Sequence, residues 1–409
     1  MKKSAQAVII GGGIIGCAAA YYLAKEIDDV ILIEKKCIAG ESSGANYGMV
    51  WQQTRQDGYD LAAARRSLEI YPQLCREVFD LDIEYEEKGG MTLFFTDLQA
   101  EAAKGYVEYK NSLGVPVRLL SGKETRSLEP ALSSRVTGSL FCAEEAQLNP
   151  FYTTLAFARA AQKEGATIYQ GVEVLSINLD RGAVCSISTS EGKIFTNHVI
   201  NAAGSWAGTV GAMVGLKVPV FPHRLQSLVT EQIPKLLTRT IQGSRIARTS
   251  EEAAKTFQYA YDTTGGNRPC INQQPPAECI IESSLFYAKP TVNGNIVLGT
   301  ACDFAGYNRE TSYEALAVIA HMAKMIIPRL KDVNIIRSWA NFDPWTADGI
   351  PIVGETGVKG FFIAAGHGTG MSHAPATGEA LAGLITGSAA AIPLGEANIN
   401  RFTGYREEC

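Results

Sequence analysis

The first forty residues contain the feature that most constrains how this chain folds. Residues 7–10 are a short apolar run, which predicts a buried strand. The spacing G-x-G-x-x-G follows at once, and the small and apolar residues 17–24 after it predict a helix. A second apolar run, residues 30–33, predicts another buried strand and ends at an acid, Glu34. Strand, glycine turn, helix and a second strand closed by an acid form the fingerprint of a dinucleotide-binding fold.

Each glycine of the fingerprint has a physical task. Gly11 permits the tight turn, Gly13 lets the backbone approach a pyrophosphate, and Gly16 lets the helix lie close to the strand. The N-terminus of the helix presents free N–H groups and the positive end of its dipole to the phosphates. Glu34 is expected to accept hydrogen bonds from the ribose hydroxyls, and its charge disfavours NADP because it would repel a 2′-phosphate. The fingerprint alone does not separate FAD from NAD.

Two later segments repeat the pattern of an apolar strand followed by a glycine turn. Residues 198–203 predict an apolar strand that ends in the turn 204–206. Residues 361–365 predict another, which runs into the turn 366–370 and then a helix over 377–385. We therefore expect a doubly wound sheet built from distant segments, with its glycine loops at the carboxyl ends of the strands, where ligands bind. An extended cofactor would contact all three loops.

The composition is that of a globular protein of two to three domains. Of its 409 residues, 46% are hydrophobic and 19% are charged. The net charge is −5 and the sequence contains no long block of like charge, which disfavours nucleic-acid binding. The nine cysteines include no C-x-x-C pair, so neither a metal site made of close pairs nor a disulfide framework is expected. Cys270 and Cys279 lie near each other; we expect free thiols there, with a metal or redox pair as the alternative.

The N-terminus superficially resembles a signal peptide or a membrane span. Lys2 and Lys3 precede an uncharged stretch, residues 4–24. Three consecutive glycines at 11–13 would break an apolar helix there, and no other uncharged apolar run of about 18 residues occurs. We expect a cytoplasmic protein without a transmembrane segment, associated with a membrane only through a partner.

Several stretches together resemble the D-amino-acid oxidase and dehydrogenase family of FAD enzymes. They are the opening fingerprint, ESSGAN at 41–46, VINAAGSWA at 199–207, DGIPIVG at 348–354 and AAGHGTGMSHAPATGEAL at 364–381. Within the family, the chain is most similar to the β or C subunits of complexes such as D-hydroxyproline dehydrogenase, opine oxidase and hydrogen cyanide synthase. The resemblance runs in order through nearly the whole chain.

The resemblance implies two interleaved domains of α/β and α+β class. A Rossmann-like FAD-binding domain is expected from residues 1–85, 146–215 and 335–409. A mainly antiparallel β-sheet substrate domain is expected from residues 86–145 and 216–334. Short β-like runs in this second part, at 225–229, 285–288 and 296–299, are compatible with that assignment.

Local signals predict further elements between these segments. Asn149 and Pro150 predict the N-cap and first residue of a helix that stops at Gly165. Residues 167–169 and 172–174 are strand candidates.

The resemblance also implies a set of cofactor contacts. Val174 matches a position whose backbone contacts the adenine, and the turn from Gly366 can place N–H groups at the N1–C2=O edge of the flavin. We expect noncovalent FAD, because the turn at 46–48 has no histidine and the loop after Trp339 has no cysteine, the two attachment points of the family. No metal is expected. The expected contacts are Gly11, Gly13, Ile14, Ile15, Gly16, Glu34, Lys35, Ser42, Ser43, Val174, Ala203, Gly204, Trp206, Gly366, His367, Gly368, Gly370 and Met371.

Members of the family oxidise a C–N bond by passing a hydride to flavin N5, which leaves an imine. The resemblance therefore implies an amino acid or secondary amino acid as substrate, of the D-amino-acid, glycine, hydroxyproline, sarcosine or opine type. In the family run W-x-G-x-R-P an arginine grips the substrate carboxylate, whereas here Asp343 takes that position. Either another cation, such as Arg55 or Arg224, replaces it, or the substrate offers a positive group to Asp343; otherwise these charges are solvated surface groups.

Two further residues complete the candidate catalytic set of Tyr287, His367, Asp343 and Arg55. Tyr287 matches a tyrosine that reaches the substrate in the glycine-oxidase pattern, or it packs within its strand. His367 either influences the flavin or the protonation of the substrate amine, or it holds its loop by a hydrogen bond. The other histidines, 198, 223, 321 and 373, are interpreted as structural.

The acceptor of the electrons is oxygen or another protein, because no second strand–GxGxxG–helix unit provides a nicotinamide site. Sarcosine oxidase has an oxygen-activating lysine where this chain has Val297. This favours a dehydrogenase that passes electrons to a partner electron-transfer subunit or a quinone, and we expect an oligomer. The alternative is an FAD-carrying electron-transfer or structural subunit without a substrate site of its own.

Overall fold

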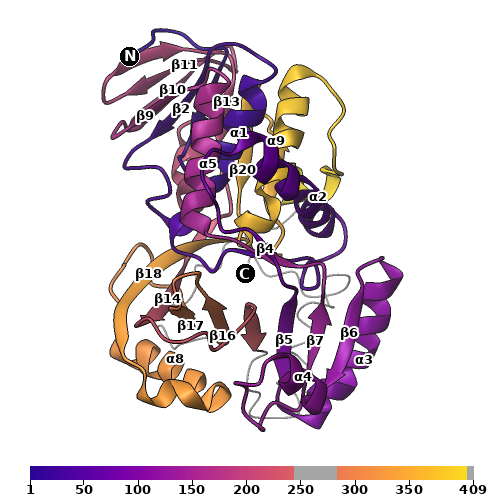
Figure 1. Ribbon diagram of the computed structural model, residues 1–409. Helices are drawn as coiled ribbons and strands as arrows, with labels where there is room; N and C mark the ends of the chain where they lie inside the picture. The colour runs from indigo at the N-terminus through magenta and orange to yellow at the C-terminus, as the bar shows by residue number, and fades with distance from the viewer. Residues whose placement is uncertain (244–282, 403–409) are drawn as a thin grey trace, which may run out of the picture.

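The computed structural model describes residues 1–243 and 283–402. Two large β-sheets organise this part of the chain, one in each half of the molecule (Figure 1). Cys270 and Cys279 lie outside the described residues. The predicted α/β and α+β fold class is confirmed.

The first sheet has six strands in the order β19-β20-β13-β1-β2-β9, and all neighbours are parallel except β19 and β20. Its strands come from both ends and the middle of the chain, as the glycine loops predict. They are β1 (Ala7–Ile10), β2 (Val30–Glu34), β9 (Thr167–Gln170), β13 (Val199–Asn201), β19 (Ile352–Glu355) and β20 (Phe361–Ala365).

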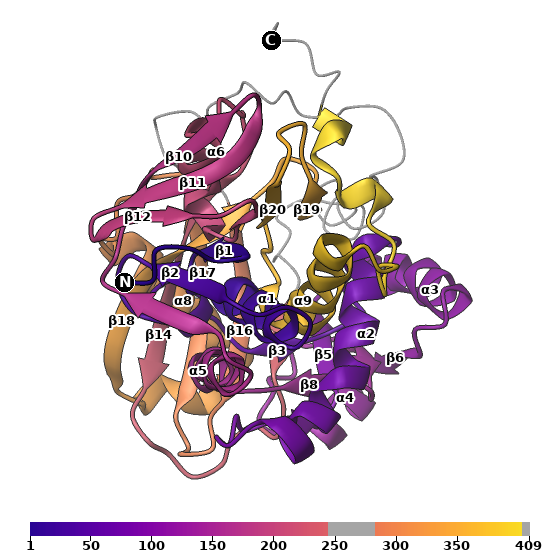
Figure 2. The ribbon, with the colours of Figure 1, turned by 90° about the horizontal axis from the view of Figure 1, so that it is seen from above.

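Alternate residues of β1 face two separate hydrophobic cores, because side chains alternate along a strand. Ala7 and Ile9 contribute to a core shared with a layer of helices, in which α1 and α9 lie side by side (Figure 2). Val8 and Ile10 contribute to the other core, under a three-stranded sheet. The helices are α1 (Ile14–Ala24), α2 (Tyr59–Gln73), α5 (Pro150–Lys163) and α9 (Gly370–Thr386); the small sheet comprises β10 (Val174–Asp180), β11 (Ala183–Thr189) and β12 (Gly192–Phe195), and α6 (Ala207–Ala212) follows β13.

The predicted helix after Asn149 is confirmed as α5. The Asn149 side chain accepts a hydrogen bond from the backbone N–H of Tyr152 at 3.2 Å, and Pro150 is the first helical residue. The predicted strand at 172–174 is wrong except for its last residue. Gly171 has a φ of +73°, and the N–H of Val172 donates to the carbonyl of Glu34, so the chain turns before β10 begins.

The helix predicted at 377–385 begins earlier, at Gly370, directly in the third glycine loop. Pro375 lies inside it and provides no N–H for the carbonyl of Met371. The phenol of Tyr71 on α2 donates to that carbonyl at 2.9 Å instead. The helix therefore continues through the proline, which sequence signals alone treat as a break.

The second sheet has eight strands in the order β18-β14-β17-β16-β15-β5-β7-β6. Neighbours are antiparallel except β15 and β5. The predicted runs at 225–229, 285–288 and 296–299 lie within longer strands. The strands are β5 (Gly90–Phe94), β6 (Val117–Ser121), β7 (Gly138–Cys142), β14 (Phe221–Thr230), β15 (Ile241–Gly243), β16 (Ser283–Pro290), β17 (Ile296–Asp303) and β18 (Ile335–Trp345); α3 (Asp97–Ser112), α4 (Gly122–Leu128) and α8 (Tyr313–Ile326) accompany them.

Residues 335–345 differ from their predicted grouping. The sequence analysis places them with the cofactor-binding segments, whereas β18 pairs along its length with β14 in the eight-stranded sheet. The remaining division of the chain into two domains stays a prediction.

Short elements connect the two large sheets. A small sheet joins β3 (Met49–Val50), β8 (Ala146–Gln147) and β4 (Glu86–Glu87), and short helical turns include η1 (Ser42–Gly44) and η3 (Gly204–Trp206). Within residues 1–243 and 283–402, no helix has the length and apolar character needed to cross a membrane.

Candidate active site

A cavity of about 310 Å³ lies where the carboxyl ends of the parallel strands meet the eight-stranded sheet. The turns that follow β1, β2, β13 and β20 line one part of it, as expected for a ligand site of a doubly wound sheet. Leu225, Tyr287 and Asn341, from β14, β16 and β18, line the other part. Every predicted cofactor contact lines the cavity except Gly16.

The absence of Gly16 from the cavity wall agrees with its predicted task. A Cβ at Gly16 would lie 2.0 Å from the carbonyl oxygen of Gly11, so this glycine lets α1 lie against the turn. Gly11 has a φ of +116°, and a Cβ there would lie 2.4 Å from the carbonyl oxygen of Ala202. Both glycines are therefore required by close backbone approach.

Glu34 and Ser43 complete the turn around the start of α1. Glu34 is 9% exposed, and its carboxylate accepts hydrogen bonds from the backbone N–H groups of Gly12, at 2.7 Å, and Lys36, at 2.8 Å. Ser43 accepts a hydrogen bond of 2.9 Å from the N–H of Ile14, the first residue of α1. These contacts hold the helix N-terminus toward the cavity.

The indole of Trp206 forms part of the cavity wall. It stacks on Tyr307, with ring centroids 5.2 Å apart. The ammonium of Lys35 lies 5.0 Å from the centre of the Trp206 ring. This end of the cavity offers a flat ring and a cation to a planar group.

His367 lies in the third glycine loop and is 6% exposed. Its Nε2 is 3.3 Å from the hydroxyl of Tyr59, and its Nδ1 is buried without a hydrogen-bond partner in the described part of the chain. Burial, together with the nearby His373, holds the pKa of His367 well below its usual value. The imidazole is therefore neutral near pH 7.

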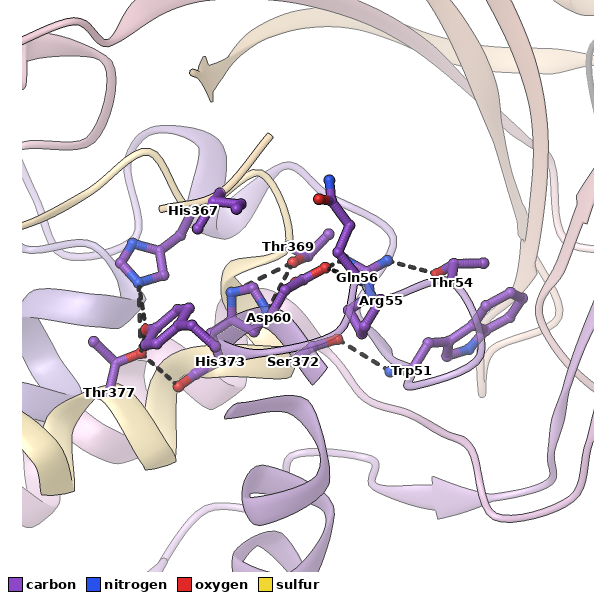
Figure 3. A network of polar contacts seen from close by, with 12 residues as sticks. Trp51, Thr54, Arg55, Gln56, Asp60, His367, Thr369, Ser372, His373 and Thr377 are labelled. Carbon is purple, nitrogen blue, oxygen red and sulfur yellow. Dashed lines mark hydrogen bonds and ion pairs between the residues drawn. The ribbon is translucent and has the colours of Figure 1, made fainter. Parts of the chain in front are cut away.

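Arg55 is the only arginine among the described residues that line the cavity. One of its terminal nitrogens lies 3.7 Å from the carboxylate of Asp60, and the other donates to the hydroxyl of Thr54 at 2.6 Å. Its Nε is buried without a hydrogen-bond partner in the described part of the chain (Figure 3). The guanidinium is held in place and still has donor capacity.

Asp343 faces the same part of the cavity. A Cβ at Gly368 would lie 3.0 Å from its carboxylate oxygen, so Asp343 lies against the third glycine loop. Burial raises the pKa of Asp343 to about 7, although Arg55 acts in the opposite direction. A carboxylate that titrates near neutral pH in a cavity is suited to exchanging a proton with a ligand.

Tyr287 also lines the cavity, and its ring stacks on that of Tyr47 at 4.8 Å. The hydroxyl of Tyr47 is hydrogen-bonded to Ser227 at 2.7 Å. Burial raises the pKa of Tyr287 above its usual value, so its phenol keeps its proton.

Comparison with known proteins identifies the family. The sequence matches the family model described as FAD dependent oxidoreductase over residues 6–384. The chain belongs to this family of FAD-dependent oxidoreductases. The match confirms the resemblance inferred from the sequence motifs and the predicted cofactor, FAD.

Individual relatives of this oxidoreductase are distant but similar over their whole length. Glycine oxidase from Geobacillus kaustophilus is 26% identical over 404 residues, which cover 97% of each chain. A crystal structure of glycine oxidase from that species has a TM-score of 0.83, with 25% identity and coverage of 98% of this chain and 99% of that one. The HcnC subunit of hydrogen cyanide synthase from Pseudomonas protegens is 27% identical over 441 residues, covering 96% of this chain and 95% of its own.

A second solved structure is equally similar. The crystal structure of L-proline dehydrogenase from P. horikoshii has a TM-score of 0.83 and 27% sequence identity. The match covers 98% of this chain and 99% of that one. The fold of the oxidoreductase is therefore shared with enzymes whose names specify different substrates.

The cavity of this oxidoreductase fits FAD. The helix N-terminus and glycine turn offer N–H groups to a pyrophosphate, and Glu34 stands where a ribose would follow. A Cβ at Gly204 would meet no atom of the described residues within 4 Å, so these residues leave the backbone of the second loop open for close approach. One continuous cavity joins Val174 to the third glycine loop, which is the extended shape that a dinucleotide requires.

Arg224, one of the two predicted carboxylate binders, is not among the residues that line this cavity. Its guanidinium donates to both carboxylate oxygens of Asp303 and to the carbonyl of Glu310. Both side chains of the ion pair are nearly buried. This correction follows from strand pairing, because β14 and β17 place Arg224 directly opposite Asp303.

Sequence reasoning missed Asp60, and it interpreted His373 as structural without identifying a partner for it. Nε2 of His373 lies 2.7 Å from the carboxylate of Asp60, which also faces Arg55, so this histidine is not remote from the site. The signal that could have indicated them is proximity in sequence. Asp60 follows Arg55 by five residues, and His373 lies in the first turn of the helix after the third glycine loop. Gln242 and Asn341, which also line the cavity, carried no recognisable motif.

Proposed function

We propose that the protein oxidises the C–N bond of an amino acid or secondary amino acid, of the D-amino-acid, glycine, hydroxyproline, sarcosine or opine type, to an imine. The observation that carries the proposal is the pair of opposite charges, Arg55 and Asp343, in one cavity with the third glycine loop. A zwitterionic amino acid offers the complementary pair, a carboxylate and an ammonium group. Glycine oxidase among the relatives is named for such a substrate.

Arg55 binds the substrate carboxylate in this proposal. Among residues 1–243 and 283–402 no group accepts from its Nε. Its side chain is 12% exposed, and an ionic hydrogen bond is stronger there than in water. Arg55 replaces the arginine that the resemblance places at the position of Asp343. Tyr287 contributes a phenol to the same pocket.

Asp343 accepts the proton of the substrate ammonium group. An amine loses a hydride from its neighbouring carbon only when its nitrogen is uncharged, so a base is needed in the site. The pKa of about 7 lets Asp343 take up and release a proton near neutral pH. His367, being neutral, adds no positive charge that would oppose a cationic substrate.

Noncovalent FAD, when bound, accepts the hydride from the carbon beside the nitrogen. The residues proposed to hold it are the predicted cofactor contacts that line the cavity. The predicted division stays part of the proposal, with 1–85, 146–215 and 335–409 as the FAD-binding domain and 86–145 and 216–334 as the substrate domain. Within the first of these, β18 pairs with β14 of the second.

The final electron acceptor is proposed to be a partner electron-transfer subunit or a quinone, which makes the protein a dehydrogenase. HcnC, a relative of similar length, is named as a subunit of a larger enzyme. An oligomer and a cytoplasmic location are part of the same proposal.

Anaerobic mixing of the FAD-loaded protein with candidate substrates tests the proposal. Glycine, D-amino acids, proline and hydroxyproline isomers, sarcosine and opines form the panel. Bleaching of the visible flavin band by one of them is expected. Admitting oxygen afterwards, or adding a quinone dye, then distinguishes an oxidase from a dehydrogenase by which of the two restores the colour.

Absence of bleaching by the whole panel, in wild-type protein that is fully loaded with FAD, would contradict the proposal. The alternative of a subunit that carries FAD without a substrate site predicts that outcome. The charged pair Arg55 and Asp343 in the cavity supports the enzymatic function over this alternative.

A further inference from the structure

The loop that carries Arg55 is held to the rest of the protein through its backbone. The N–H of Trp51 donates to the hydroxyl of Ser372 at 3.0 Å, and the phenol of Tyr106 donates to the carbonyl of Gln53 at 2.6 Å. The ammonium of Lys110 donates to the carbonyl of Arg55 itself. The backbone of Arg55 is therefore fixed, but these contacts leave the direction of its side chain undetermined.

The direction of the guanidinium depends on the hydroxyl of Thr54, to which it donates at 2.6 Å, and on Asp60, which lies in the first turn of α2 and is 5% exposed. One carboxylate oxygen of Asp60 accepts from the N–H of Gln56 at 2.7 Å. The other oxygen is 2.7 Å from Nε2 of His373 and 3.7 Å from a terminal nitrogen of Arg55 (Figure 3). His373 thus holds the hydrogen bond, whereas Arg55 has only an ion pair with this oxygen.

This division of contacts has a physical consequence for Arg55. A buried carboxylate requires hydrogen-bond donors for its oxygens. Without the donor of His373, the guanidinium of Arg55 is the neighbouring group able to supply one. It would then turn toward Asp60 and away from the cavity. His373, itself 1% exposed, opposes this turn because it supplies the short hydrogen bond to the oxygen that both groups face.

The position of His373 adds a second relationship. It lies in the first turn of α9, which begins in the third glycine loop, and its ring is within hydrogen-bond distance of the hydroxyl of Thr369. The same residue therefore connects the loop proposed to face the flavin with the arginine proposed to face the substrate carboxylate.

We propose that His373 is a positioning residue, which by its hydrogen bond to Asp60 directs the guanidinium of Arg55 into the cavity for binding the substrate carboxylate. This inference rests on the proposed function, since it assigns His373 a task only if Arg55 binds a carboxylate. His373 acts through Asp60 and contacts neither the substrate nor the reacting atoms.

Calorimetric titration of the FAD-loaded protein with acetate tests the inference, because acetate offers a carboxylate without an amine. His373→Leu removes the donor at similar volume, and we expect it to weaken acetate binding about tenfold, the scale of one ionic hydrogen bond. His373→Gln restores a donor and should return the affinity to within about twofold of wild type. Methylamine, which carries no carboxylate, should bind all three proteins equally.

A double-mutant cycle shows whether the effect passes through Asp60. In an Asp60→Asn background, residue 60 carries no charge for His373 to compensate. His373→Leu should therefore cause no further change in acetate affinity. The melting temperature and the flavin absorption spectrum of each variant confirm that it is folded and loaded. Where the leucine variant does not accumulate as loaded protein, His373→Asn, whose amide is too short to reach Asp60, makes the same comparison.

The outcomes separate the two proposals. If wild type does not bind acetate, or Arg55→Ala binds it equally well, the proposed role of Arg55 fails. If acetate binds through Arg55 but His373→Leu matches wild type, or if the leucine and glutamine variants lose affinity equally, the inference about His373 fails while the proposed function stands.

Discussion

The carboxylate of Glu34 accepts a hydrogen bond of 2.7 Å from the backbone N–H of Gly12, which ties the end of β2 to the first glycine turn. Glu34→Ala leaves this N–H and that of Lys36 without their acceptor. We expect the free energy of unfolding of the FAD-free protein to fall by about 1–3 kcal/mol and FAD binding to weaken. Denaturant unfolding and titration with FAD measure the two effects. Glu355→Ala, at an exposed strand end, is the control; equal FAD affinity in both variants would contradict the prediction.

Gly11 and Gly165 form a matched pair for a test of the turn. Both have positive φ, +116° and +103°. A Cβ at Gly11 would lie 2.4 Å from the carbonyl oxygen of Ala202, whereas a Cβ at Gly165 would meet no atom within 4 Å in the part of the chain that the structure describes. Gly165→Ala should destabilise by about 1 kcal/mol, from backbone strain alone. Gly11→Ala should destabilise by about 1–3 kcal/mol more and abolish FAD binding. Thermal unfolding and FAD content after purification check this, and equal behaviour of the two variants would refute it.

The raised pKa of Asp343 predicts a pH dependence of activity. Below about pH 7 the folded protein holds Asp343 protonated, and above it the carboxylate is free to accept a proton. We expect kcat/KM to rise with pH through about 7, and Asp343→Asn to remove this limb of the profile. Since Arg55 lowers the pKa of Asp343, Arg55→Gln should move the limb to higher pH. A limb that survives Asp343→Asn unchanged would assign the titration to another group.

The same pKa shift predicts how stability depends on pH. Between the ordinary aspartate value of about 4 and about 7, the folded state binds a proton at Asp343 that the unfolded state has released. The free energy of unfolding therefore falls as pH rises through this range. Denaturant unfolding of the FAD-free protein at several pH values should show this slope, and Asp343→Asn should reduce it. A slope of the opposite sign attributable to Asp343 would show that its pKa is lowered instead.

Arg224 and Arg55 should respond differently to the same substitution. Arg224 makes a nearly buried two-pronged ion pair with Asp303, so Arg224→Ala leaves an uncompensated carboxylate and should destabilise by about 3–5 kcal/mol. Arg224→Lys keeps the charge, and its affinity for acetate should equal that of wild type. Arg55→Lys should weaken acetate binding because a lysine lacks the planar fork of donors. Loss of acetate binding in Arg224→Lys at unchanged stability would restore Arg224 as a carboxylate binder.

Tyr287 and Tyr47 both line the cavity, and the hydroxyl of Tyr47 is hydrogen-bonded to Ser227, so the two phenols can be compared. Tyr287→Phe keeps the stack on Tyr47, at 4.8 Å, and removes only the hydroxyl. We expect a higher KM for the substrate at unchanged melting temperature. Tyr47→Phe removes the hydrogen bond to Ser227 and should lower the free energy of unfolding by about 1 kcal/mol. Steady-state kinetics and thermal unfolding distinguish the two; an unchanged KM in Tyr287→Phe would make Tyr287 a packing residue.

Local signals in the sequence were sufficient to predict the glycine turns and the acid that line one part of the cavity. Gly11, Gly13 and Glu34 belong to one continuous motif, in which strand, turn and helix follow one another with little chain between them. Their relative positions are set by short-range geometry, so spacing alone predicted them. The same reasoning failed at the start of α9, where Tyr71, remote in sequence, replaces the hydrogen bond that Pro375 cannot make.

The part of the cavity that contains Arg55 and Asp343 was decided by tertiary structure. The sequence motifs and the family that they resemble indicated an FAD-binding Rossmann-like fold without the usual arginine at Asp343. They left Arg55, Arg224 or a positive group on the substrate as alternatives. Strand register placed Asp303 opposite Arg224, so the charge of Arg224 is paired with that of Asp303. Packing of α2 against α9 brought Asp60 and His373 together beside Arg55 and left that guanidinium facing the cavity. Which of two cations is free to bind a ligand depends on partners that are distant in sequence, and only the folded chain brings those partners together.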